Sequence, residues 1–248
     1  KIDLDKYYTD NGTVQHCLSV VDNLLIDYSE VIEPSAGNGA FSLQIPNCIA
    51  YDIEPEHENI IKQDFLKLDL PYKEGRLIIG NPPFGYTNNL ARSFYKHSCK
   101  IADYIAFILP VGLLNNSDSL YEFDLIHSED LGKIKYSGRY VHCCFNVYKR
   151  PNNKILNKKP NYKIDWIVIC RDDEKKYDDF EYDFAICRRG NIGKIRTENL
   201  QSSTHKIKVL DKTKINLVKE TILNFDWIAN KPFCSAPYIT KNDIWKLF

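Results

Sequence analysis

The 248-residue sequence predicts an α/β fold, in which an open sheet carries helices on both faces, followed by a small basic α+β region at the C-terminal end. Three observations lead to this prediction. Short apolar runs alternate with amphipathic stretches up to residue 149. A polar side chain directly follows several of these runs. After residue 149 the composition becomes polar and basic.

Composition is that of a soluble globular protein, with 44% hydrophobic and 27% charged residues. The eight cysteines form no CxxC pair, and the sequence contains neither a secretory signal nor a long apolar run. We therefore expect reduced thiols, no bound metal and no membrane association. The expected location is the cytoplasm, either of the organism itself or of a host cell in which a viral or phage protein acts.

Charge is unevenly distributed along the chain. Residues 1–148 hold 12 basic and 20 acidic side chains, whereas residues 149–248 hold 21 and 13. The two parts therefore carry −8 and +8. This asymmetry predicts an acidic body and a basic C-terminal portion that faces a polyanion. The alternative is that lysines are merely plentiful on that surface.

The first element is a predicted helix over residues 13–25, where apolar side chains recur every three or four positions. Thr13 or Asn11 is expected to cap it. A strand at residues 31–32 then leads into a turn that contains Gly37 and Gly39 and is expected to open a second helix. Both glycines permit positive φ and close approach of a ligand, the layout of nucleotide-type sites in open α/β sheets.

Acidic residues mark the ends of three successive predicted strands: Glu33, Asp52 and Asp64. Asp52 lies nineteen residues after Glu33, the approximate spacing of a carboxylate that accepts from both ribose hydroxyls. Asp64 is placed to accept from an adenine amino group. Because the carboxyl ends of such strands meet at one edge of the sheet, we expect the three side chains to share a site.

The stretch around which the chain is organised is Asn81-Pro82-Pro83-Phe84, which follows an apolar strand at residues 76–80. The two prolines fix two φ angles and remove two donors, so their carbonyls are rigidly aimed acceptors. Asn81 adds a side-chain acceptor and Phe84 an aromatic face. This turn suits a planar group that carries an NH2, such as a nucleobase. The alternative is a proline-stiffened loop with a buried Phe.

The remaining elements follow in order. The sequence predicts a helix over 91–101, a buried strand over 104–110 and a hairpin of 134–140 with 143–148; then strands over 165–170 and 182–188, an acidic loop over 172–179, a helix over 212–229 and a last helix capped by Thr240. A glycine-containing basic segment carries Arg188, Arg189, Lys194 and Arg196. It is either a hairpin that contacts a nucleic-acid backbone or a solvated β-turn.

Taken together, the motifs resemble class I S-adenosylmethionine (SAM)-dependent methyltransferases that act on exocyclic amines. In their order they are similar to the gamma-type adenine-N6 DNA methyltransferases of restriction–modification systems. The resemblance extends over residues 6–148 and rests on Tyr8-Thr9, Glu33-Pro34-x-x-Gly37-x-Gly39-x-Phe41, Asp52-Ile53-Glu54-Pro55, Asp64-Phe65 and Asn81-Pro82-Pro83-Phe84-Gly85. It implies a Rossmann-like class I methyltransferase sheet, a SAM-binding catalytic domain over residues 1–149 and a target-recognition, DNA-binding region over residues 150–248.

The resemblance also implies a role for each matched residue. Tyr8 and Thr9 would flank the methionine portion of SAM, and its amino-acid end would be held by Glu33, Pro34, Gly37 and Gly39. Asp52 would bind the ribose of SAM, and Asp64 and Phe65 would bind its adenine. Asn81 would also contact the cofactor. For the target adenine, flipped out of double-stranded DNA, Asn81 and Pro82 would bind the amine, Pro83 would complete the catalytic turn, and Phe84 would stack on the base. Phe145 is the candidate for the opposite face of the base. The basic segment would contact DNA.

Several alternatives stay open at this point. RNA adenine-N6 and protein glutamine-N5 methyltransferases use similar turns, although the glutamine enzymes favour Tyr where this chain has Phe84. A non-catalytic nucleic-acid-binding subunit should have lost Gly37, Asp52 or Asn81, and all three are present. The C-terminal region is small for a recognition domain, so that a short site, a homodimer or a partner subunit would explain it.

Overall fold

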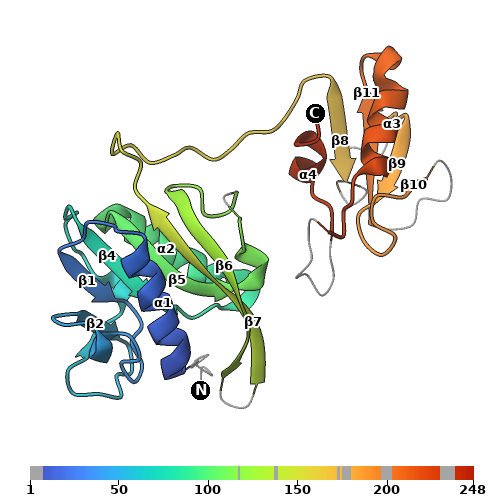
Figure 1. Ribbon diagram of the computed structural model, residues 1–248. Helices are drawn as coiled ribbons and strands as arrows, with labels where there is room; N and C mark the ends of the chain where they lie inside the picture. The colour runs from blue at the N-terminus through green and yellow to red at the C-terminus, as the bar shows by residue number, and fades with distance from the viewer. Residues whose placement is uncertain are drawn as a thin grey trace. The chain divides into compact units, whose positions relative to one another are not determined.

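The computed structural model describes residues 8–116, 118–136, 139–171, 174, 180–196, 203–229 and 238–248. The chain forms two compact units, one up to Pro160 and one from Asn161 onward, each with its own sheet (Figure 1). Of the predicted acidic loop at 172–179, all but Glu174 lies outside the described residues.

The first unit is built on a seven-stranded sheet with the order β3-β2-β1-β4-β5-β7-β6. Its strands are β1 (Glu30–Glu33), β2 (Ile49–Asp52), β3 (Ile61–Lys62), β4 (Arg76–Gly80), β5 (Tyr104–Pro110), β6 (Asp124–Tyr136) and β7 (Arg139–Lys149). The first five are parallel, and β7 runs antiparallel to both β5 and β6. The predicted α/β fold, with an open Rossmann-like sheet, is confirmed.

Helices cover both faces of this sheet, α1 (Asn11–Asn23) on one side and α2 (Asn89–Ile101) on the other. Figure 1 shows α1 crossing in front of the strands. Alternate strand residues point to the two helices, so that Leu77 packs on the α1 side and Ile78 on the α2 side. Because both faces are buried, β4 and β5 appear in the sequence as continuous apolar runs.

Two local predictions are wrong. Asp10, rather than Thr13 or Asn11, caps α1: its two carboxylate oxygens accept from the backbone N–H of Thr13 at 3.0 Å and from its hydroxyl at 2.7 Å. These hydrogen bonds lower the pKa of Asp10. The glycine turn does not open an α-helix but leads to a short 3-10 turn, η1 (Ser42–Gln44). Ile45 precedes Pro46, which disfavours the helical region, and Ile45 is extended.

The hairpin of β6 and β7 is antiparallel, as expected, but β6 begins ten residues before the predicted start at residue 134. The pairing register shifts between Leu125 and His127 and again between Asp130 and Gly132. These irregularities, together with the position of β6 at the sheet edge, break the alternation of apolar and polar residues by which a strand is recognised in a sequence.

The second unit has a four-stranded antiparallel sheet with the order β10-β9-β11-β8. Its elements are β8 (Ile167–Arg171), β9 (Phe184–Cys187), β10 (Ile195–Arg196), β11 (Thr204–Val209), α3 (Ile215–Asn224) and α4 (Lys241–Trp245). One core joins the sheet to both helices, and Thr240 caps α4 as predicted. The α3 helix is shorter than predicted because Phe225 is extended. Within the described ranges, no helix is long and apolar enough to cross a membrane.

Candidate active site

Adjacent parallel strands bring the ends of β2, β1 and β4 to one edge of the first sheet. The loops that leave these strands bond to one another. The N–H of Ala36 donates to the Tyr51 carbonyl at 2.9 Å, and the Ser35 hydroxyl donates to the Asn81 carbonyl at 3.3 Å. The predicted residues that follow these strands therefore do lie close together in one part of the first unit.

Glu33, the last residue of β1, is only 2% exposed. Its carboxylate accepts from the backbone N–H of Ser42 at 2.7 Å and from that of Phe41 at 3.4 Å. It therefore braces the turn that contains Gly37 and Gly39. Burial raises the pKa of Glu33 to about 7, although the hydrogen bonds from Ser42 and Phe41 oppose this shift.

This raised pKa predicts a pH-dependent stability. Because the pKa of Glu33 in the folded state lies above its ordinary value of 4.5, the folded protein binds more protons between the two values. The Glu33 contribution is therefore fully present below pH 4.5 and is lost as the pH rises through about 7, by roughly 3 kcal/mol. We expect Glu33→Gln to flatten this dependence, so that the variant gains stability relative to wild type between pH 5 and pH 8 in urea unfolding. Parallel pH profiles of the two proteins would contradict the assignment.

Gly37 and Asp52 form the next part of the site. Asp52 ends β2, and its two carboxylate oxygens accept from the N–H of Gly37 at 2.7 Å and from that of Glu54 at 2.8 Å. Gly37 and Gly39 have φ values of 54° and 86°, the left-handed region that favours glycine. A Cβ built on Gly37 would have no heavy atom of the described residues within 4 Å, so the backbone here borders open space.

Asp64 and Phe65 lie beyond the short strand β3. Asp64 caps the 3-10 turn η2 (Phe65–Lys67) by accepting from the N–H of Leu66 at 3.1 Å, and it pairs with Lys67 at 3.4 Å. The Phe65 side chain is buried on the α2 side of the core, where its ring stacks on Phe94 with a centroid separation of 5.6 Å. Only the backbone of Phe65 is therefore available to a ligand at the strand ends.

Asn81 begins the turn after β4. Its side-chain NH2 donates to the Thr9 hydroxyl at 3.2 Å and to the Tyr136 hydroxyl at 3.4 Å. The other side-chain atom, Asn81 Oδ1, is buried and has no hydrogen-bond partner in the part of the chain that the structure describes. A buried acceptor without a partner costs folding free energy, so its presence calls for an explanation.

The aromatic residues of the predicted site are less accessible than expected. Phe84 is 7% exposed and belongs to the core cluster on the α1 side, and Pro82 is buried next to the half-buried Pro83. A base could stack on Phe84 only by replacing part of its present contacts. Phe145 is completely buried at a position in β7 opposite Ile108 of β5. Its place in the structure is that of a core residue, not of a residue at a site.

The N-terminal segment reaches this edge of the sheet. Thr9 is buried against Asn81, and the Tyr8 hydroxyl donates to Glu56 Oε1 at 2.6 Å. Glu56 in turn donates its N–H to the carbonyl of Gly37 at 2.9 Å. Sequence reasoning missed Glu56 and Tyr136. Glu56 stands one residue beyond the matched stretch 52–55, whereas nothing in the sequence connects Tyr136 with Asn81.

The basic segment of the second unit forms the turn between β9 and β10. The N–H of Cys187 donates to the Lys194 carbonyl at 3.0 Å and closes the turn. Arg189 and Lys194 are exposed, whereas Arg188 and Arg196 are half-buried. A Cβ on Gly193 would overlap the Trp227 indole. This glycine therefore serves packing within the unit rather than approach to a nucleic acid.

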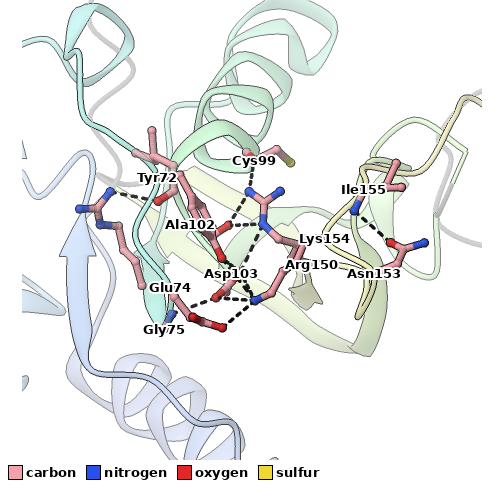
Figure 2. Close-up of polar contacts among 12 residues, drawn as sticks. Tyr72, Glu74, Gly75, Cys99, Ala102, Asp103, Arg150, Asn153, Lys154 and Ile155 are labelled. Carbon is pink, nitrogen blue, oxygen red and sulfur yellow. Dashed lines mark hydrogen bonds and ion pairs between the residues drawn. The ribbon is translucent and has the colours of Figure 1, made fainter.

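A cavity of about 370 Å³ lies at the opposite edge, where β1, β4 and β5 begin, and is lined in part by Glu74, Asp103, Arg150 and Lys154. Figure 2 shows that these charged groups bind one another. Arg150 Nε pairs with Asp103 Oδ1 at 3.2 Å, and Lys154 Nζ pairs with Glu74 Oε1 at 3.1 Å. Since these four charged groups are already paired with one another, they stabilise the first unit, and the cavity is not the candidate site.

No protein-family model matches this sequence, and neither does any curated protein. Solved structures of similar fold include a candidate RNA methyltransferase from Pyrococcus horikoshii, with a TM-score of 0.49, 16% identity and coverage of 60% of this chain and 89% of that one. A second is the modification subunit of a candidate type I restriction enzyme from Vibrio vulnificus YJ016, with a TM-score of 0.47 and 14% identity. That comparison covers 60% of this chain and 45% of the other. A third is magnesium protoporphyrin IX methyltransferase from Synechocystis PCC 6803 with bound SAM, with a TM-score of 0.41 and 12% identity. That comparison covers 56% of this chain and 79% of the other. This chain is similar to these proteins in fold alone.

Proposed function

We propose that this protein is a SAM-dependent methyltransferase that transfers a methyl group to the N6 amine of an adenine flipped out of DNA. The observation that carries the proposal is the buried oxygen Asn81 Oδ1, which has no partner among the described residues. It stands at the end of the buried strand β4, next to the end of β1 that carries Glu33, and the end of β2 that carries Asp52 lies beyond it. An amine donor would satisfy this oxygen once its present cover gives way, and would explain its cost.

The groups at this edge fit SAM. A carboxylate offers about four acceptor directions, and Asp52 uses two of them for Gly37 and Glu54. The remaining two suit a pair of ribose hydroxyls. The open space beside Gly37 admits a ligand, and Glu33 keeps the turn in shape. Asp64 retains acceptor capacity for an adenine amine. When bound, SAM supplies an activated methyl group on a positively charged sulfur.

The chain's own contribution to the chemistry is orientation. The N6 lone pair of adenine is delocalised into the ring, which makes the amine a poor nucleophile. Two fixed acceptors, Asn81 Oδ1 and the Pro82 carbonyl, would hold its two hydrogens and direct the lone pair away from the ring plane. The prolines keep these dipoles in place before the reaction, so that little reorganisation is needed as charge develops. The proton can leave afterwards, and no general base is required.

The target adenine must leave the duplex to reach such a turn, at a cost of a few kcal/mol. Phe84 follows the catalytic turn directly and is the proposed stacking partner, once its present cover gives way. Contacts to phosphates would stabilise the extruded state, and the exposed Arg189 and Lys194 are the proposed donors.

The proposal is tested by incubating the protein with SAM and, separately, with unmodified plasmid DNA and total RNA. Each nucleic acid is digested to nucleosides and analysed by mass spectrometry, with Asn81→Ala as the control. N6-methyldeoxyadenosine that is absent with Asn81→Ala is the expected result. Methylated adenosine in RNA alone would move the substrate to RNA. No methylated nucleoside in either sample, despite SAM binding, would overturn the adenine assignment.

The basic turn gives a second prediction. We expect Arg189→Ala with Lys194→Ala to weaken DNA binding and to reduce the slope of log K against log salt by about 1 for each phosphate that is no longer neutralised. Fluorescence anisotropy at several salt concentrations measures both quantities. Lys158→Ala with Lys159→Ala, which removes equal charge from exposed positions just before the end of the first unit, is the matched control. Equal effects of the two double variants would show that binding depends on net charge rather than on this turn.

A further inference from the structure

Asn81 is held by residues from two distant parts of the chain. Its side-chain NH2 donates to Thr9, which precedes α1, and to Tyr136, the last residue of β6. The hairpin makes the second hydrogen bond possible because it projects past the end of β5. Pro110 ends β5 opposite Cys143, whereas the paired strands continue to Tyr136 opposite Arg139. The tip of an edge hairpin thus reaches the end of β4.

Packing and a further polar contact fix the position of the Tyr136 hydroxyl. The ring is 1% exposed in the core cluster on the α1 side, and the oxygen lies 3.7 Å from Cys143 Sγ. Burial raises the pKa of Tyr136, so that the group stays a neutral hydroxyl. Its oxygen can accept from an amide while its O–H donates elsewhere. Thr9 is buried as well. Both partners of the Asn81 amide are therefore preorganised.

We propose that Tyr136, together with Thr9, is a positioning residue that fixes the orientation of the Asn81 amide for methyl transfer. This inference rests on the proposed function. An asparagine amide can rotate so that its oxygen and nitrogen exchange places. In the wrong orientation, Nδ2 would face the target amine, and two donors would oppose each other. In the structure both hydroxyl oxygens accept from Nδ2, and the Tyr136 O–H can donate to Cys143 Sγ instead of to the amide. The amide oxygen is then left to face the amine.

The test compares Tyr136→Phe with wild type in steady-state methylation of DNA. The substitution keeps the buried ring and removes only the hydroxyl. We expect kcat to fall roughly 10-fold, because a loosely held catalytic group loses the geometry of attack. The KM for SAM should change less than about twofold. Thr9→Val should likewise lower kcat, whereas Thr9→Ser, which keeps a hydroxyl, should restore most of it.

Tyr148→Phe is the matched control. Tyr148 is also completely buried, and its hydroxyl accepts from Asn146 Nδ2 at 2.8 Å, on β7. This variant should lose stability but keep kcat. If the wild type is active but Tyr136→Phe keeps the wild-type kcat, or loses no more kcat than Tyr148→Phe does, this inference alone is overturned. A wild type that methylates neither DNA nor RNA removes the proposed function, and the inference with it.

Discussion

Asn81→Ala should lower the rate of methyl transfer about 10²- to 10³-fold and lower the affinity for SAM much less. Removing one preorganised group that meets developing charge has effects of this size. SAM is proposed to depend mainly on Glu33, Asp52 and the backbone at Gly37, which the substitution does not alter. Single-turnover methylation and calorimetric titration with SAM measure the two quantities separately.

Asn81→Asp provides the matched comparison. A carboxylate keeps an acceptor toward the target amine, and the hydroxyls of Thr9 and Tyr136 can donate to its other oxygen. This variant should therefore keep more activity than Asn81→Ala. If Asn81→Ala transferred methyl groups at the wild-type rate, the acceptor role of Asn81 Oδ1 would be wrong even if the protein were a methyltransferase.

Arg150→Ala should destabilise the first unit by about 3–5 kcal/mol, the usual cost of breaking a buried ion pair. Arg150 is buried, with 8% of its surface exposed. Its guanidinium donates to the carbonyls of Cys99 at 2.5 Å and Ala102 at 2.9 Å, at the C-terminal end of α2. It also pairs with the buried Asp103. Without Arg150, the last helix carbonyls would lose their donor. Asp103 would lose its buried cation and keep only Tyr72, Gly75 and the more distant Lys154.

The three tryptophans make this prediction easy to measure. Trp166, Trp227 and Trp245 all belong to the second unit. In urea unfolding, the Arg150→Ala effect should therefore appear in far-UV circular dichroism, to which both units contribute, and not in tryptophan fluorescence. Lys73→Ala is the control, because the exposed Lys73 pairs with Glu30, which keeps Arg76 as a partner, and such surface pairs add little. Equal losses of stability in the two variants would refute a special role for Arg150.

The strand ends could be predicted from the sequence because their signal is local. Each consists of a short apolar run followed at once by a polar residue, as at Asp52 and Asn81. Parallel pairing of the strands then brings these residues to one edge of the sheet. Strand β11 was not predicted although it carries a pattern of period two. Lys206 and Lys208 alternate with the buried Ile207 and Val209. The two lysines made this segment look like an exposed polar stretch, although long lysine side chains can lie along one face of a central strand.

Side-chain exposure at the site could not be predicted in the same way. Phe84 and Phe145 have the residue type that a stacked base requires, but packing decides whether such a ring is accessible. In β7, Phe145 shares one face with Cys143 and Val147, and all three are buried. The hydrogen bond between Asn81 and Tyr136 joins positions 55 residues apart and depends on how far a hairpin extends. No local pattern in the sequence indicates how far the hairpin extends.

The order in which the strands are synthesised differs from their order in the sheet. Strand β7 pairs with β5 but is made after β6, and Arg150 follows β7 directly. On the ribosome, β5 therefore lacks this neighbour, and the end of α2 lacks its guanidinium, long after Asn81 has emerged. A nascent chain that ends at Lys149 carries every residue of the proposed active site but not the side chain that secures α2. We expect stable folding of the first unit to begin only when synthesis has passed Arg150.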